Sequence, residues 1–192
     1  MAAGLPSLDS WLRDAPGASL LEAETALLAE VLDDVFGWEL LQVGLWGPPR
    51  GLIHASRTRQ QTLIAERAVE GVNLVTRLPQ LPIASGTVDA VLLPHTLEFL
   101  PDPKAMIRET DRVLAGEGQL IVVGLCPWSL WGMRSRLSRG RFPPGVRSLL
   151  AERRICDWLA LLGYEIIASR HCLHSAYILK ARKRVYTMTP IR

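Results

Sequence analysis

The stretch LPIASGTVDAVLLPHTLEFLPDPKAMIRETDRVLAGEGQLIVVG (81–124) decides the fold of this chain. Two nearly continuous apolar runs, VDAVLLPH (88–95) and QLIVVGLC (119–126), enclose the segment PKAMIRETDRVL (103–114). Apolar runs of this length without polar alternation are typical of strands buried on both faces, as in a parallel sheet. The middle segment opens on a proline that follows an aspartate, a pattern that favours a helix start. Strand, helix and strand in this order predict a parallel α/β unit.

The flanking sequence continues the alternation. A helix is expected over 19–36, where a stripe at helical spacing runs from Leu20 through Glu24 to Val35. Strands are predicted at 39–44, 61–66 and 72–76, before the deciding stretch. A helix at 146–162 and a closing, antiparallel pair of strands at 164–170 and 175–183 follow it. The whole pattern predicts a doubly wound, mostly parallel α/β sheet with a terminal antiparallel strand.

The connections around the second strand are irregular. A Gly/Pro-rich turn (46–51) is expected to lead into a short helix that begins at Pro48 or Pro49 and reaches about Arg59. Only residues 67–71 then separate Glu66 from the third strand, although parallel strands need about a dozen residues to connect. One crossover helix is therefore expected to be missing, unless the second strand begins earlier, at 52–56.

Composition indicates one globular domain. The 192 residues are 48% hydrophobic and 21% charged, which excludes a disordered chain. We divide the chain into a helical lead-in (1–37) and an α/β core (38–192). No apolar run approaches the ~18 residues of a membrane span, and no secretory signal is visible. Three widely spaced cysteines, Cys126, Cys156 and Cys172, favour a reducing, cytoplasmic compartment.

Four segments of the deciding stretch together resemble a known family. LPI (81–83), VDAV (88–91), LEF (97–99) and RVLAGEGQLIVV (112–123) are similar, in this order, to the second half of the methyltransferase type 11 domain. That family belongs to the class I S-adenosylmethionine-dependent methyltransferases. The resemblance implies a Rossmann-like sheet and a cofactor, S-adenosylmethionine, bound beyond the carboxyl ends of the strands.

The first half of the chain departs from the family pattern. In the family, the first strand ends in an acid followed by a G-x-G-x-G turn; here the matching segment is QVGLWGP (42–48). Gln42 takes the place of the acid, Gly44 matches the first glycine, and Trp46 and Pro48 replace the other two. Gly47 lies one position away. A tryptophan at a position of close approach obstructs the cofactor unless the loop follows another path.

Carrying the family's cofactor contacts over by position gives a predicted site. Glu66, 22 residues past Gly44, matches the acid that binds the ribose hydroxyls, although it also fits an ordinary loop acid. Arg77 stands where the family has an acid near the adenine. The predicted cofactor residues are Gly44, Trp46, Gly47, Glu66, Leu78, Leu93, Pro94 and His95. His95 is also the candidate general base, with a structural role as its alternative.

Other candidates lie in the second half of the chain. Trp128, Trp131 and Met133 are predicted to line a substrate pocket, or else to pack a lid helix. No metal site is expected, because His171 and His174 point to opposite faces of a strand. Seven arginines and one acid between Arg134 and Arg154 form a basic region that fits an anionic partner or a solvated face.

These observations leave three functions open. The leading hypothesis is an S-adenosylmethionine-dependent methyltransferase with an unidentified acceptor, in which catalysis comes from positioning the reactants. The alternative is an inactive pseudo-methyltransferase that binds a ligand or partner. This alternative is supported by the loss of the family's residues at four positions, Gln42, Trp46, Pro48 and Arg77. A third is a nucleic-acid-associated module that uses the basic region, with binding that falls steeply with salt.

Overall fold

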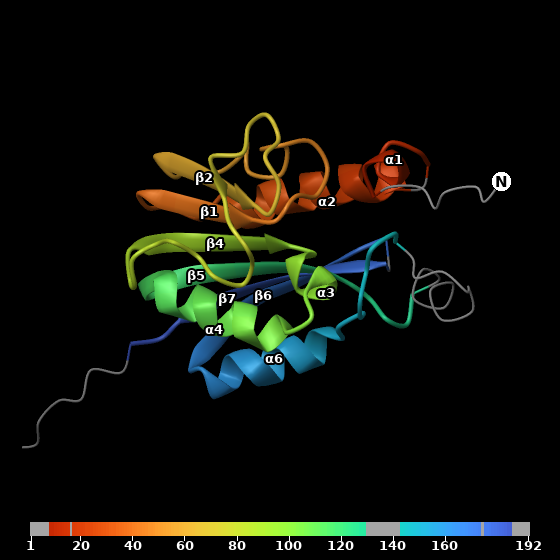
Figure 1. Ribbon diagram of the computed structural model, residues 1–192. Coiled ribbons are helices and arrows are strands. Elements are labelled where there is room, and N and C mark those ends of the chain that lie inside the picture. Colours follow the sequence, from red (N-terminus) through yellow and green to blue (C-terminus); the bar gives the residue numbers. More distant parts are fainter. Residues whose placement is uncertain (1–7, 16, 130–142, 174, 186–192) are drawn as a thin grey trace, which may run out of the picture.

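A computed structural model describes residues 8–15, 17–129, 143–173 and 175–185 of the chain. Within these residues, seven strands form one sheet in the order β3-β2-β1-β4-β5-β7-β6 (Figure 1). The strands are β1 (Glu39–Val43), β2 (Gln60–Ala65), β3 (Leu74–Val75), β4 (Val88–Pro94), β5 (Leu114–Leu125), β6 (Tyr164–Cys172) and β7 (Ala176–Lys183). The helices are α1 (Leu8–Trp11), α2 (Gly17–Leu32), α3 (Thr96–Phe99), α4 (Pro103–Val113) and α6 (Glu152–Leu161).

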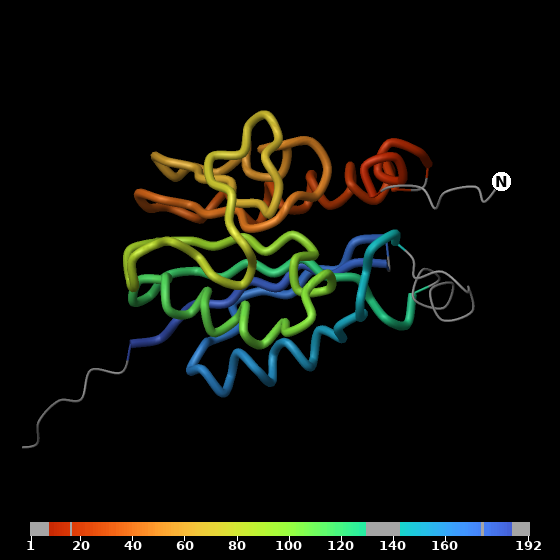
Figure 2. The backbone as a smooth tube through the Cα atoms, viewed as in Figure 1, coloured from red at the N-terminus to blue at the C-terminus, as the bar shows by residue number. Residues whose placement is uncertain are grey.

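The sheet is mostly parallel. Of the described strands, only β7 runs in the opposite direction to the others, and it pairs antiparallel with both β5 and β6. All other pairings, from β3 through β5, are parallel. This confirms the predicted α/β fold with an antiparallel strand near its end. The order reverses between β1 and β4, and Figure 1 shows β1 and β2 on one side of this boundary and β4, β5, β7 and β6 on the other. The continuous backbone is drawn in Figure 2. Open α/β sheets bind ligands at such a reversal, beyond the carboxyl ends of the strands.

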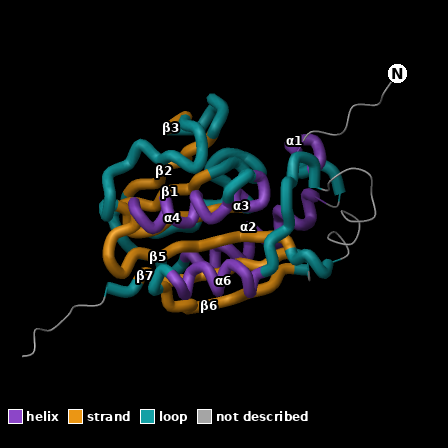
Figure 3. The backbone as a smooth tube through the Cα atoms, turned by 60° about the horizontal axis from the view of Figure 1, so that its bottom comes forward, coloured by secondary structure: helices purple, strands orange, loops and turns teal. Residues whose placement is uncertain are grey.

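Each face of the sheet carries its own hydrophobic core. Helices α3, α4 and α6 cover one face, where Leu97, Met106 and Ile155 pack on the sheet. Helices α1 and α2 cover the other, with Trp11 and Leu28 among the buried residues. Figure 3 shows α4 and α6 in front of the sheet and α2 behind it. The arrangement is thus doubly wound, and none of the described helices is long and apolar enough to cross a bilayer.

Two aspartates of the deciding stretch accept backbone N–H groups, and one of them, Asp102, caps the start of its helix as predicted. The carboxylate of Asp89 accepts the backbone N–H groups of Trp38 and Glu39 at 2.7 and 3.0 Å, which fastens β4 to the start of β1. Asp102 caps α4 by accepting the Ala105 N–H at 3.0 Å. Both contacts satisfy backbone donors that would otherwise lack a partner at the end of an element.

The connection from β1 to β2 differs from the prediction. Residues 48–55 form turns, so the helix expected from Pro48 or Pro49 to Arg59 is wrong. Leu52 and Ile53 are nevertheless buried and take part in the core beside α2. Turns that deliver two large apolar side chains therefore fill the place that a crossover helix would cover. The predicted helix 146–162 is also too long, because α6 begins only at Glu152.

The connection from β2 to β3 is short, as the residue count predicted. Residues 66–73 join the two parallel strands without a helix, and β2 does not begin at 52–56. The short link is possible because β3 pairs only with the last two residues of β2, Ile64 and Ala65. The chain therefore has to travel back along the sheet by only a short distance. Two crossover helices, rather than one, are missing between β1 and β3.

Candidate functional site

A pocket of about 330 Å³ lies at the carboxyl ends of β1, β2 and β4. Four of the predicted cofactor residues line it: Gly44, Glu66, Leu78 and Pro94. They come from four segments that are distant in sequence, and the reversal of strand order brings them together. We call this the strand-end pocket. Its volume lies within the range of small-molecule sites.

Gly44 lines the strand-end pocket in a backbone conformation that favours glycine. Its φ of +99° lies in the region that favours glycine, and a Cβ atom there would come within 2.5 Å of Thr96 Oγ1. The Thr96 hydroxyl donates a hydrogen bond to the carbonyl of Val43, so the ends of β1 and β4 are tied together. The position therefore requires glycine for the fold, and it also brings bare backbone to the pocket wall.

Glu66 joins two walls of the pocket. Its Oε1 accepts the backbone N–H of Leu78 at 3.2 Å, which links the end of β2 to the segment after β3. The side chain is exposed, and no described residue donates a hydrogen bond to its second oxygen, Oε2. The carboxylate is thus oriented by one bond and retains an acceptor at the pocket.

Trp46 does not enter the strand-end pocket. Its side chain is 1% exposed and turns toward the core, where Nε1–H donates to Glu24 Oε2 at 2.7 Å. Its ring centroid lies 3.9 Å from that of His95. The loop after β1 is therefore redrawn, and the tryptophan that departs from the family pattern leaves the pocket open. Leu93 is also buried, within the core on the α4 side.

His95 does not line the strand-end pocket, although its neighbours Pro94 and Thr96 do, and its side chain lies in a buried charged cluster. Its Nε2 contacts Glu24 Oε1 and its Nδ1 contacts Glu98 Oε2, each at 2.9 Å, and all three side chains are essentially inaccessible. Burial lowers the pKa of His95, but the charges and hydrogen bonds of Glu24 and Glu98 outweigh it and raise the pKa to about 9. Its backbone is left-handed, with φ 55°.

This environment does not support His95 as a general base. An imidazole that carries both protons near neutral pH has no free lone pair, and its burial separates it from the pocket. Glu98 also accepts the Leu125 N–H at 2.7 Å, and burial raises the pKa of its carboxyl group. The cluster, which consists of Glu24, Trp46, His95 and Glu98, therefore connects α2, the loop after β1, β4 and β5.

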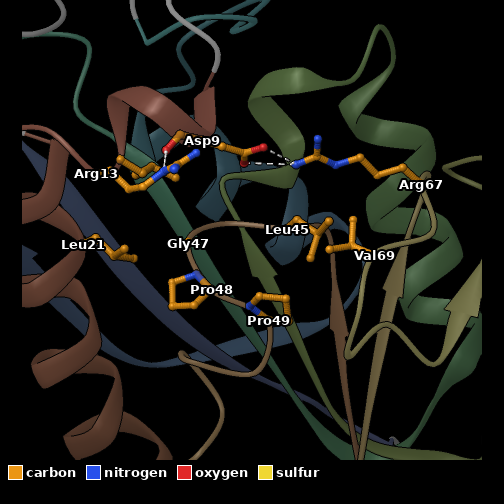
Figure 4. A pocket seen from close by; sticks show the side chains of 10 residues that line it. Asp9, Arg13, Leu21, Leu45, Gly47, Pro48, Pro49, Arg67 and Val69 are labelled. Atoms are coloured by element: carbon orange, nitrogen blue, oxygen red, sulfur yellow. Dashed lines mark hydrogen bonds and ion pairs between the residues drawn. The ribbon is translucent and has the colours of Figure 1, made fainter.

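A second pocket, of about 430 Å³, lies beside the first and is lined by Gly47 (Figure 4). We call it the loop pocket, because residues 45, 47, 48 and 49 form much of its wall. The two pockets share three lining residues, Asp9, Leu45 and Arg67. The Arg67 guanidinium donates to both Asp9 carboxylate oxygens, at 2.8 and 3.0 Å, across this common rim.

Gln42 and Arg77, which depart from the family pattern, and Trp128, a predicted substrate residue, line neither pocket. Gln42 is 1% exposed; its Nε2 donates to the Gly44 carbonyl at 3.1 Å, and its Oε1 is buried without a partner among the described residues. Arg77 is exposed and lines neither pocket. Trp128 is 79% exposed after β5 and also lines neither of them. Trp131, Met133 and the basic region up to residue 142 lie outside the described residues.

Several lining residues were not predicted. Leu45 and Arg67 directly follow predicted contacts, and Thr96 and Phe99 belong to α3, which begins just after the predicted contact His95, so adjacency was the available signal. Leu8 and Asp9 come from α1, for which no motif gave a signal. Glu24 had one, because it is a carboxylate on the otherwise apolar stripe of α2.

Comparisons with known proteins agree with this geometry. Residues 51–122 match the model of a family described as a methyltransferase domain. A solved S-adenosylmethionine-dependent methyltransferase of Thermotoga maritima, described as a possible histamine N-methyltransferase, superimposes with a TM-score of 0.67 at 16% identity. The match covers 86% of this chain and 92% of that one. The chain has the class I methyltransferase fold. The resemblance to the type 11 family predicted from residues 81–124 is thereby confirmed.

Two curated relatives share more of the sequence. YafS of Escherichia coli is 41% identical over 93 residues, which are 47% of this chain and 38% of YafS. Rv2003c of Mycobacterium tuberculosis is 30% identical over 177 residues, which are 86% of this chain and 60% of that protein. Both are described as uncharacterized. This methyltransferase-fold chain thus spans less than two thirds of either relative's length.

Proposed function

We propose that this protein binds S-adenosylmethionine in the strand-end pocket and transfers its methyl group to an acceptor molecule. One observation carries the proposal: four residues selected by family position, Gly44, Glu66, Leu78 and Pro94, line one pocket at the strand-order reversal. Nothing in their sequence spacing alone requires this convergence. The methyltransferase family match and fold support the same assignment.

The residues present fit such a cofactor. Gly44 offers backbone without a side chain, and Glu66 Oε2 can accept the hydroxyl hydrogens of a ribose. Leu78, Phe99 and Leu100 provide apolar surface for a purine ring. The cofactor would supply an electrophilic methyl group, and the chain's own contribution would be to hold the reactants in line and exclude water.

Calorimetric titration with S-adenosylhomocysteine and S-adenosylmethionine tests the proposal. Glu66→Ala should weaken binding about tenfold, because a hydrogen-bonded carboxylate contributes about that factor. Glu70→Ala is the matched control: it removes an exposed acid in the same loop that lines neither pocket. If the Glu66 and Glu70 variants lose affinity for these ligands equally, the proposed contact of Glu66 with the ribose is rejected.

If neither S-adenosylmethionine nor S-adenosylhomocysteine binds at millimolar concentration, the proposed methyltransferase activity is rejected. The alternative, an inactive pseudo-methyltransferase, would then remain. Two observations favour the pseudo-methyltransferase: Gln42 is neutral and replaces an acid of the family pattern, and Arg77 is exposed where the family has an acid.

We further propose a cytoplasmic location, on the basis of three free cysteines. An anionic partner at the basic region, Arg134–Arg154, also stays a proposal, since the structure describes only residues 143–154 of it.

A further inference from the structure

The loop pocket adjoins the strand-end pocket and has seven described lining residues that the strand-end pocket does not share. It has a volume of about 430 Å³, and Gly47, Pro48 and Pro49 of the loop after β1 line it. Figure 4 shows Leu21 of α2 on one side, Pro48 and Pro49 below and the Asp9–Arg67 pair above. Methyl transfer requires the two reactants to be held next to each other, and the loop pocket meets the proposed cofactor pocket at Asp9, Leu45 and Arg67.

The wall of the loop pocket is apolar and stiff. Leu12, Leu21, Leu45 and Val69 contribute aliphatic surface, and the two prolines of the turn contribute rigid rings. A Cβ atom at Gly47, whose φ is +76°, would lie 2.7 Å from the Leu21 side chain, so the bare backbone of the loop packs directly against α2. This wall therefore suits an apolar body and loses little entropy when one binds.

The charged side chains that line the two pockets give them net charges of opposite sign. Asp9 and Arg67 belong to both pockets and pair with each other. Among the described lining residues, the strand-end pocket has one further charge, the carboxylate of Glu66, and the loop pocket has one further charge, the guanidinium of Arg13. Arg13 is held over its pocket by a bond from Nε to the Asp9 carbonyl, at 3.1 Å. One pocket is thus net negative and the other net positive.

We propose that the loop pocket binds the methyl acceptor, a small molecule with an apolar body and an anionic group such as a carboxylate held by Arg13. The inference rests on the proposed function, because the negative pocket suits a sulfonium cofactor and the positive one its acceptor. The acceptor's nucleophilic atom lies at the shared wall beside Leu45. Its lone pair forms the bond to the methyl carbon, the carbon–sulfur bond breaks with its electrons left on sulfur, and a neutral nucleophile gives its proton to water.

Octanoate is a suitable probe, and octan-1-ol is its uncharged counterpart. Calorimetry on the full chain should show octanoate binding both alone and with S-adenosylhomocysteine already bound, and octanoate binding more tightly than octan-1-ol. Arg13→Gln should weaken octanoate about tenfold and change S-adenosylhomocysteine affinity less than about twofold. The control is Arg153→Gln, which removes an exposed arginine on α6, on the other face of the sheet.

A second variant tests the pocket itself. Val69 lines the loop pocket and not the strand-end pocket, so Val69→Trp should fill the former and abolish octanoate binding while S-adenosylhomocysteine still binds. Competition between octanoate and S-adenosylhomocysteine would overturn the proposal, because the loop pocket would then belong to the cofactor. Equal effects of the Arg13 and Arg153 variants, or no octanoate binding at millimolar concentration, would also overturn it.

The outcomes separate the two proposals. Binding of S-adenosylhomocysteine without octanoate rejects the acceptor site alone. Arg13-dependent binding of octanoate without S-adenosylhomocysteine rejects the methyltransferase and, with it, the acceptor role, and leaves an anion-binding pocket on a non-catalytic fold.

Discussion

The indole N–H of Trp46 donates to the buried carboxylate of Glu24 at 2.7 Å. This bond ties the loop after β1 to the middle of α2, and both elements also line the loop pocket through Gly47 and Leu21. Glu24 is shared, because its other oxygen contacts His95 at the end of β4. One carboxylate thus fixes the relative positions of the elements that enclose both pockets.

Replacing Trp46 by phenylalanine should lower the free energy of unfolding by about 2–3 kcal/mol, since it leaves Glu24 without one donor and opens space in the core. Urea denaturation measures the loss. Trp38→Phe makes the same chemical change at a side chain that is 61% exposed, and should alter stability by less than about 0.5 kcal/mol. Similar losses in the two variants would show that the buried bond contributes little.

Stability should fall as the pH rises through about 9. The pKa of His95 is raised from 6.5 to about 9 in the folded protein, so protonated His95 favours the folded state. That contribution is complete below pH 6.5 and is lost as the pH approaches and passes 9, by up to about 1.4 kcal/mol per pH unit. Urea midpoints from pH 6 to 9.5 measure it. His95→Gln should flatten the profile; an unchanged slope would place the titration elsewhere.

The strands could be predicted from sequence because their signals are local. The apolar runs at 88–95 and 119–126 contain β4 and most of β5, and a simple residue count showed that the link from β2 to β3 has no room for a helix. The prediction failed at Pro48. Proline favours the first turn of a helix, but here Leu52 and Ile53 bury their side chains from turns instead.

Four of the eight predicted cofactor residues line the strand-end pocket, because their positions follow from where strands end. Gly44, Glu66, Leu78 and Pro94 end strands or follow them, and topology gathers such positions at one edge. Glu24 and His95 are 71 residues apart, and no local pattern pairs them. Trp46 looked like an obstruction because sequence gives the size of a side chain and not its direction. Only the buried partner, Glu24, explains why the ring turns inward.

Gly44→Ala should cost more stability than Gly86→Ala. Both glycines have positive φ, so alanine at either position should cost about 1 kcal/mol in backbone strain. A Cβ at Gly86 meets nothing within 4 Å, whereas one at Gly44 meets Thr96 Oγ1 at 2.5 Å. The clash should add about 1–3 kcal/mol, measured by thermal or urea unfolding. Equal losses of stability in the two variants would show that Thr96 moves aside without a cost in free energy.

Asp9→Asn should change the affinities for the two ligands in opposite directions. The exposed Asp9–Arg67 pair contributes little to folding, about 0–1 kcal/mol, but its loss leaves Arg67 as an unpaired cation beside both pockets. S-adenosylmethionine, which carries a sulfonium, should bind about threefold more weakly, and octanoate about threefold more tightly. Asp33→Asn breaks another exposed pair, with Arg57, away from both pockets and should change neither affinity. Calorimetry at low salt measures both; a shift of both affinities in the same direction would contradict the assigned charge balance.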